Sequence, residues 1–195
     1  MRVTNVLMAG VGGQGIIMAS DILSRLMLNA GLDVKKSEVH GMAQRGGSVT
    51  CHVRFGPHVF SPLIKQGEVD ILMAFEKLEA LRYLYYLRTG ARVLLNDLEI
   101  SPPSVCLGKE SYPGGIPDLI HERGMRLLMI PGLTLARQAG NIRAANVVLL
   151  GVLSTWLDVE EGYWTEAIES SFPRRLVSVN LEAFRLGRAA GIQAS

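Results

Sequence analysis

The sequence predicts an α/β fold with a mostly parallel sheet and a helical C-terminal third. Residues 3–9 form a nearly unbroken apolar run, typical of a strand covered on both faces. The glycine-rich segment 10–15 (GVGGQG) follows, and apolar residues then recur at helical spacing from Ile16 to Met27. Strand, glycine loop and helix in this order are typical of the first unit of a Rossmann-like layered fold.

Periodicity and breakers predict the remaining elements. The segment 49–55 alternates, with Val49, Cys51, Val53 and Phe55 opposite Thr50, His52 and Arg54, so we expect a half-buried strand with Cys51 in the core. Other strands are expected at 33–40, 69–75, 91–96 and 125–130, and helices at 76–88, 131–140, 163–170 and 176–190. The proline- and glycine-rich stretch 100–117 is the expected loop excursion.

The segment 144–157 is apolar almost all round, which predicts a helix that is either buried or pressed against another subunit. The mean hydropathy of +0.23 also favours a surface that is partly covered by a partner. The isolated chain is therefore expected to self-associate or aggregate through the 144–157 helix or its neighbours.

Length and composition indicate one domain spanning residues 1–195. Hydrophobic residues make up 48% of the chain and charged residues 19%, which excludes disorder and a coiled coil. The net charge of +2, with no basic run longer than two residues, predicts no nucleic-acid partner.

The longest apolar stretch of the chain, 144–157, is shorter than the roughly 20 residues that a membrane span needs. Because the N-terminus lacks a signal-peptide pattern, we expect a cytoplasmic protein.

The cysteines and histidines give no pattern for a metal site. Cys51 and Cys106 are the two cysteines, whereas an iron–sulfur cluster normally takes four thiolates, so the chain is not expected to hold a cluster alone. The four histidines, His40, His52, His58 and His121, show no metal-binding motif. We therefore expect no catalytic residue and no metal ligand in this chain.

The glycine loop is the first candidate site. Gly10, Gly12 and Gly15 have GxGxxG spacing, and together with Gly13 and Gln14 they predict a cofactor or anion site at a helix N-terminus. A dinucleotide site would also use an acid such as Glu38 after the second strand. Alternatively, the glycines serve only tight strand–helix packing. The absence of a lysine at residues 14–16 argues against a P-loop.

The second candidate site is the run from Ser37 to Ser48. It concentrates polar and glycine residues where the second strand should end, namely Glu38, His40, Gln44, Arg45, Gly46 and Gly47. Ligands bind at the carboxyl ends of strands in open α/β sheets, so these residues should lie near the glycine loop. Arg45 and the glycines after it would offer a guanidinium and backbone amides to a phosphate or carboxylate. The alternative is a solvated turn with a Glu38–Arg45 ion pair.

Three segments together resemble the gamma-type domain of the 2-oxoacid:ferredoxin oxidoreductases. They are GVGGQGIIMAS at 10–20, SEVHGMAQRGGSVTCHVRFG at 37–56 and SPLIKQGEVDILMAFEKLEALR at 61–82. Within the second, EVHGMAQRGGSV resembles the indolepyruvate branch of that family. The resemblance runs to about Leu95 and resumes at 143–151, where Asn146 matches a family position.

The resemblance implies a cofactor-free small subunit that is inactive alone. A large partner subunit would carry thiamine diphosphate, magnesium and [4Fe-4S] clusters, oxidise aryl pyruvates such as indolepyruvate to acyl-CoA, and reduce ferredoxin. Gly10 to Gly15 and the polar run from Glu38 to Gly47 would face the substrate or coenzyme A at that active site. A self-sufficient NAD(P)- or FAD-binding oxidoreductase and a non-catalytic scaffold module are the alternatives.

Overall fold

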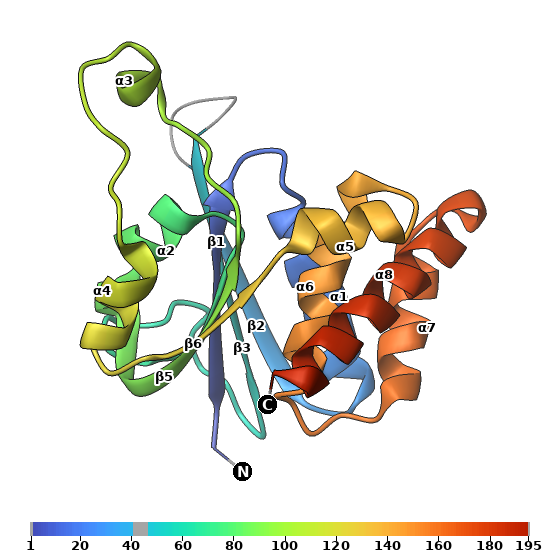
Figure 1. Ribbon diagram of the computed structural model, residues 1–195. Coiled ribbons are helices and arrows are strands. Elements are labelled where there is room, and N and C mark those ends of the chain that lie inside the picture. The colour runs from blue at the N-terminus through green and yellow to red at the C-terminus, as the bar shows by residue number, and fades with distance from the viewer. Residues whose placement is uncertain (1, 41–46, 195) are drawn as a thin grey trace.

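A computed structural model describes residues 2–40 and 47–194 and contains one mixed sheet (Figure 1). The strands in the described residues are β1 (Thr4–Val11), β2 (Asp33–His40), β3 (Ser48–Gly56), β4 (Val69–Ala74), β5 (Leu87–Asn96) and β6 (Arg126–Ile130). Their order across the sheet is β2-β3-β1-β4-β5-β6, and β3 alone runs opposite to the other strands. The predicted mostly parallel sheet is confirmed.

Helices cover both faces of the sheet, as a Rossmann-like layered fold requires (Figure 1). One face is covered by α1 (Ile16–Asn29), α5 (Gly132–Gln138), α6 (Ala145–Ser154), α7 (Glu161–Ser171) and α8 (Arg174–Gln193). The other carries α2 (Lys77–Arg82) and α4 (Ile116–Glu122), while the short α3 (Pro103–Cys106) stands beyond the sheet edge. The helical C-terminal third is therefore confirmed. In the described residues, no helix is long and apolar enough to cross a membrane.

The central position of β1 explains its unbroken apolar sequence. Val6 and Met8 belong to the core under α1, whereas Leu7 and Ala9 belong to the core on the other face. All four side chains are fully buried. A strand that is covered on both faces needs no polar alternation.

The prediction that 49–55 is half-buried is wrong on one face. Cys51 is in the core as expected, but Thr50 and His52 are buried too. The chain after β3 folds back over this face: the Ile64 amide donates to His52 Nδ1 at 3.2 Å, and the Tyr86 ring packs edge-on against the imidazole. Burial lowers the pKa of His52. The alternation of polar and apolar residues therefore marks a polar core contact here, not a solvent face.

The helix predicted at 76–88 is shorter than expected. It ends at Arg82, a 3-10 turn spans Leu84–Tyr86, and β5 already begins at Leu87. Leu84 and Leu87 both insert into the core on the α2 side of the sheet. Burying both side chains requires the tighter turn followed by extended chain. Tertiary packing therefore overrides the local helical pattern.

The apolar helix expected at 144–157 is α6, and this chain itself covers it. Every residue from Asn146 to Ser154 is buried. The helix approaches α8 so closely that a Cβ built on Gly187 would lie 1.9 Å from the Val148 carbonyl oxygen. For residues 146–154 the alternative of a helix pressed against another subunit is therefore wrong, whereas residues 155–157 of the predicted segment are only half-buried.

Candidate functional site

The glycine loop follows β1 at the carboxyl edge of the parallel strands. Gly10 has no space for a side chain, because a Cβ there would lie 2.8 Å from the Cβ of Phe75. Gly13 and Gly15 both have positive φ angles, which other residues rarely adopt. The Gly15 carbonyl accepts hydrogen bonds from the Ala19 amide and from Asn146 Nδ2. Three of the predicted glycines therefore shape the turn, and Gly12 and Gly13 are exposed at its tip.

Gln14 uses its side chain to hold the loop on the sheet. Its Oε1 accepts from the Val11 amide at 2.6 Å, and its Nε2 donates to the Phe75 carbonyl at 3.0 Å. Asn96 donates to the same carbonyl and accepts from the Gly132 amide. Both ends of the Gln14 amide are thus engaged within the protein, which makes it a positioning residue of the loop.

The polar run expected at this edge is only partly described. Gln44, Arg45 and Gly46 lie outside the described residues. Gly47 lies against the glycine loop, where its carbonyl accepts a 2.9 Å hydrogen bond from the Gly12 amide. His40 is the last residue of β2. The structure thus brings Gly47 to the glycine loop, as the sequence predicts.

Glu38 does not reach the glycine loop. It pairs with Lys36 at 2.5 Å, and Lys36 also pairs with Asp21 of α1. In the sheet, Glu38 of β2 pairs with Cys51 of β3, and Cys51 pairs in turn with Met8 of β1. The antiparallel β3 lies between β2 and β1, so two strand spacings, about 10 Å, separate Glu38 from β1. A ribose-binding acid stands on a strand adjacent to β1, so this order does not support the dinucleotide alternative.

A cleft of about 620 Å³ opens beside the glycine loop, and the sequence analysis did not predict it. Its walls come from the ends of β1 and β3, from α2 and from the segment that carries α3. The lining residues are Val11, Gly47, Ser48, Glu76, Leu78, Glu79, Arg82, Ile100, Ser101, Pro102, Pro103, Cys106 and Leu107. The cleft therefore lies at the carboxyl edge of the sheet, where α/β proteins bind ligands.

Glu76 fixes the outer wall of this cleft. It is buried, and its carboxylate caps α2 by accepting from the Glu79 amide at 2.9 Å. The same carboxylate accepts from the Ile100 amide at 3.0 Å and from the Tyr112 hydroxyl. Burial and the Glu76 carboxylate raise the pKa of Tyr112, so this hydroxyl keeps its proton and remains a donor. One carboxylate thus joins α2 to two points of the 100–117 excursion, Ile100 and Tyr112.

Glu79 lies on the inner wall, close to the glycine loop. The Ser48 hydroxyl donates to it, and Arg82 lies 3.5 Å from its other oxygen. Burial raises the pKa of Glu79, although the Ser48 hydrogen bond and the Arg82 charge oppose this shift. The Arg82 side chain is about half exposed, so it leaves a cation at the cleft mouth. The arrangement can offer Arg82 to an anionic ligand.

Sequence reasoning missed Glu76 and Glu79 as site residues. The available signal was a pair of acids at the start of a helix that directly follows a buried parallel strand, which is the usual position of ligand-binding groups. For a metal site, no suitable group of three or more His, Cys, Asp or Glu side chains exists within residues 2–40 and 47–194.

Comparisons with known proteins agree with the resemblance seen in the sequence. A family model described as pyruvate ferredoxin/flavodoxin oxidoreductase matches residues 5–190. The chain is 40% identical to indolepyruvate oxidoreductase subunit IorB of Thermococcus kodakarensis over 96% of this chain and 95% of that protein.

Two solved structures share the fold. The gamma subunit of a keto/oxoacid ferredoxin oxidoreductase from Geobacter sulfurreducens has a TM-score of 0.74 at 22% identity, covering 97% of this chain and 99% of that one. The 2-oxoglutarate:ferredoxin oxidoreductase of Magnetococcus marinus, solved with 2-oxoglutarate, coenzyme A and succinyl-CoA bound, has a TM-score of 0.77 at 25% identity. That match covers 100% of this chain and 32% of the other. The chain therefore belongs to the pyruvate ferredoxin/flavodoxin oxidoreductase family.

Proposed function

We propose that this chain is the small subunit of a 2-oxoacid:ferredoxin oxidoreductase that converts indolepyruvate, or a related aryl pyruvate, to its acyl-CoA. The 40% identity to an indolepyruvate oxidoreductase subunit over nearly the full length of both chains supports the substrate class. The EVHGMAQRGGSV segment, which resembles the same branch, is consistent with it.

The cofactors belong to the large partner subunit in this proposal. Thiamine diphosphate with magnesium supplies the decarboxylation there, and [4Fe-4S] clusters pass the electrons to ferredoxin. A cluster normally needs four thiolates. Cys51 lies in the core and Cys106 in α3, so these two thiols offer no shared site.

The carboxyl edge of the sheet faces the partner's active site in this proposal. The observation that carries it is the convergence, at this one edge, of the exposed backbone of Gly12 and Gly13, of Gly47, and of the cleft with Arg82 at its mouth. These groups would bind the anionic parts of the substrate or coenzyme A and exclude water from the reaction. Arg45, with Gln44 and Gly46, remains a prediction from the sequence as part of the same surface.

Two further expectations remain part of this proposal. Residues 1–195 would act as one gamma-type domain, located in the cytoplasm. The isolated chain would also self-associate, but through surfaces other than α6. His40 and Glu38 would lie at the margin of the site, since the Lys36 ion pair already engages Glu38.

Affinity purification of the tagged chain from its native cells tests the proposal. We expect one large subunit to co-purify in stoichiometric amount, bringing iron and thiamine diphosphate, while the chain expressed alone is colourless. Calorimetry of the chain alone should detect no NAD(H) or NADP(H) binding. A stoichiometric flavin, or a micromolar NAD(H) site on the chain alone, would instead establish the self-sufficient oxidoreductase.

A further inference from the structure

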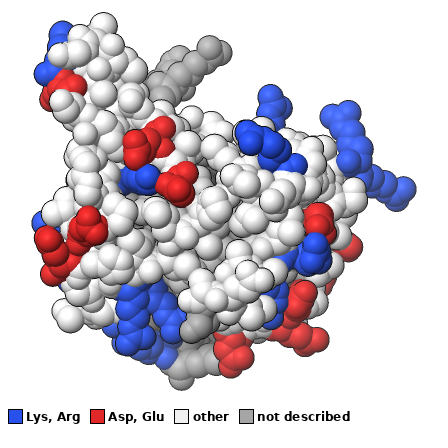
Figure 2. Space-filling view, in the orientation of Figure 1, with Lys and Arg blue, Asp and Glu red and all other residues white. Residues whose placement is uncertain are grey.

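A second cleft, of about 510 Å³, lies at the opposite edge of the sheet, where the parallel strands begin. Its described lining includes Arg2, Arg88, Arg92 and Arg126 but only one carboxylate, Asp70, which gives a net formal charge of +3. Figure 2 shows basic side chains gathered at the lower edge of the molecule, below the sheet region of β5 and β6. We call this feature the arginine cleft.

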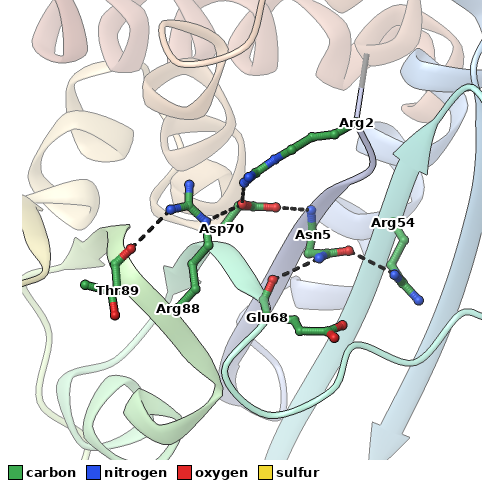
Figure 3. A network of polar contacts seen from close by, with 7 residues as sticks. All are labelled: Arg2, Asn5, Arg54, Glu68, Asp70, Arg88 and Thr89. Atoms are coloured by element: carbon green, nitrogen blue, oxygen red, sulfur yellow. Dashed lines mark hydrogen bonds and ion pairs between the residues drawn. The ribbon is translucent and has the colours of Figure 1, made fainter.

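Asp70 orders two of the four arginines (Figure 3). It is buried, and its Oδ2 accepts from the Asn5 amide at 2.9 Å. Its Oδ1 accepts from Arg88 Nε at 2.5 Å and also pairs with Arg2. Arg88 is fixed further by a 3.1 Å hydrogen bond from Nη1 to the Thr89 carbonyl. Asp70 therefore neutralises one charge while holding two guanidinium groups in place.

Arg92 and Arg126 form the unusual part of the cleft. They are direct partners in the parallel ladder of β5 and β6, so their side chains leave the same face of the sheet. Arg92 lies over the Trp156 ring, 5.5 Å from its centroid. Among the described residues, neither arginine has an ion-pair or side-chain hydrogen-bond partner. Like charges at facing positions of a sheet are destabilising. An anion that contacts both guanidinium groups would remove this cost.

The extent of the cleft indicates what kind of anion it fits. The guanidinium groups of Arg2 and Arg88 meet at Asp70 on β4, Arg92 follows on β5, and Arg126 lies on β6, two strand spacings or about 10 Å from Asp70. One phosphate spans only a small part of this row. An extended peptide with an acid at every second residue spaces successive carboxylates by about 7 Å, so two or three of them cover this row. Arginine forks also match carboxylates in bidentate geometry.

We propose that the arginine cleft binds a carboxylate-rich, extended segment of the large partner subunit. The identity of the partner rests on the proposed function, whereas the anion site rests on the arginines alone. The cleft lies at the edge opposite the glycine loop, so the partner would contact this chain at two separate places.

Arg126→Glu is the variant that tests the proposal, with Arg174→Glu as the matched control. Arg174 is exposed at the start of α8 and is not part of the cleft. Arg126→Glu should leave the isolated chain equally or more stable to urea, because a Glu there can pair with Arg92. It should nevertheless weaken binding at least tenfold, both of the large subunit and of a labelled Glu-Thr-Glu-Thr-Glu peptide. The control should stay within about twofold, and added salt should weaken peptide binding to the wild-type chain.

The outcomes separate this proposal from the proposed function. If the wild-type chain fails to associate with the large subunit, the proposed function fails, and peptide binding still reports on the cleft. If the large subunit binds wild type and Arg126→Glu equally, the docking proposal is overturned although the proposed function stands. If inorganic pyrophosphate binds in an Arg126-dependent way and the peptide does not, the cleft is a small-anion site and the docking proposal is again overturned.

Discussion

The Gly12 amide donates a 2.9 Å hydrogen bond to the Gly47 carbonyl, and this bond joins the glycine loop to the chain that enters β3. In the adjacent ladder position Val11 pairs with Ser48, whose hydroxyl donates to Glu79 in α2. Three segments that are distant in sequence therefore form one hydrogen-bonded unit at the carboxyl edge of the sheet. A substitution in one of them should alter the other two.

Glu79→Gln should change how stability depends on pH. Burial raises the pKa of Glu79 above the ordinary value of about 4.3, so the folded protein binds this proton more tightly than the unfolded chain. The free energy of unfolding that Glu79 contributes is therefore present at low pH and decreases as pH rises from the unfolded to the folded pKa. Glutamine cannot lose a proton, so urea titrations should show a flatter pH profile for the variant. Glu122→Gln, at an exposed position, should leave the wild-type profile unchanged. Parallel profiles for wild type and Glu79→Gln would contradict this assignment.

Gln14→Ala should destabilise the chain by about 1–3 kcal/mol. The substitution leaves the Val11 amide without its acceptor, whereas the Phe75 carbonyl keeps its bond from Asn96. Gln14→Glu should recover only part of the loss, since its second oxygen would face the Phe75 carbonyl. Gln138→Ala at the exposed end of α5 should stay within about 0.5 kcal/mol of wild type. Equal stabilities for the Gln14 and Gln138 variants would show that the hydrogen bonds of the Gln14 side chain do not stabilise the fold.

Gly187→Ala should cost about 2 kcal/mol or more, because the new Cβ would lie 1.9 Å from the Val148 carbonyl oxygen and force α6 and α8 apart. This cost outweighs the roughly 1 kcal/mol that alanine contributes to a helix. Gly162→Ala in α7 is the matched control, since its Cβ would meet nothing closer than 3.9 Å. The control should be as stable as wild type or more so in thermal unfolding. A Gly187→Ala protein as stable as wild type would mean that the two helices do not touch this closely.

Arg45→Ala should lower kcat/KM of the assembled enzyme by about 10- to 100-fold, the range that corresponds to losing a charge-assisted hydrogen bond of roughly 1.5–3 kcal/mol. Arg45→Lys should recover little, because an ammonium cannot reproduce the bidentate fork. Titrating aryl pyruvate and coenzyme A separately would identify the anion from the KM that rises. If the alanine variant assembles normally and keeps kcat and both KM values, Arg45 belongs to a solvated turn.

Local sequence patterns were sufficient to predict the elements whose burial is visible in the periodicity of their own residues. The run 3–9 and the spacing from Ile16 to Met27 correctly predicted β1 and α1, because burial on both faces or on one stripe leaves a direct signature. The position of β3 between β2 and β1 has no such signature. Strand order depends on pairing between distant segments, and it decides that Glu38 lies away from the glycine loop.

The candidate site was predicted in part for the same reason. The glycine loop carries its signal in sequence, since the positive φ of Gly13 and Gly15 and the close approach at Gly10 require glycine. The cleft with Glu76 and Glu79 forms only when the proline-rich excursion returns over α2, which spacing within α2 cannot reveal. Likewise, the apolar surface of 144–157 predicted burial but not whether this chain or a partner supplies the cover. Gly151 and Gly187 let α8 supply it.

Reconstitution of activity from separate subunits tests whether this chain is a required part of the oxidoreductase. The large subunit and this chain should be purified separately and then mixed, and the reduction of ferredoxin should be followed with indolepyruvate and coenzyme A. We expect negligible turnover by this chain alone, little by the large subunit alone, and ferredoxin reduction by the mixture that requires both indolepyruvate and coenzyme A. Full activity of the large subunit without this chain, or no gain on mixing, would contradict this expectation.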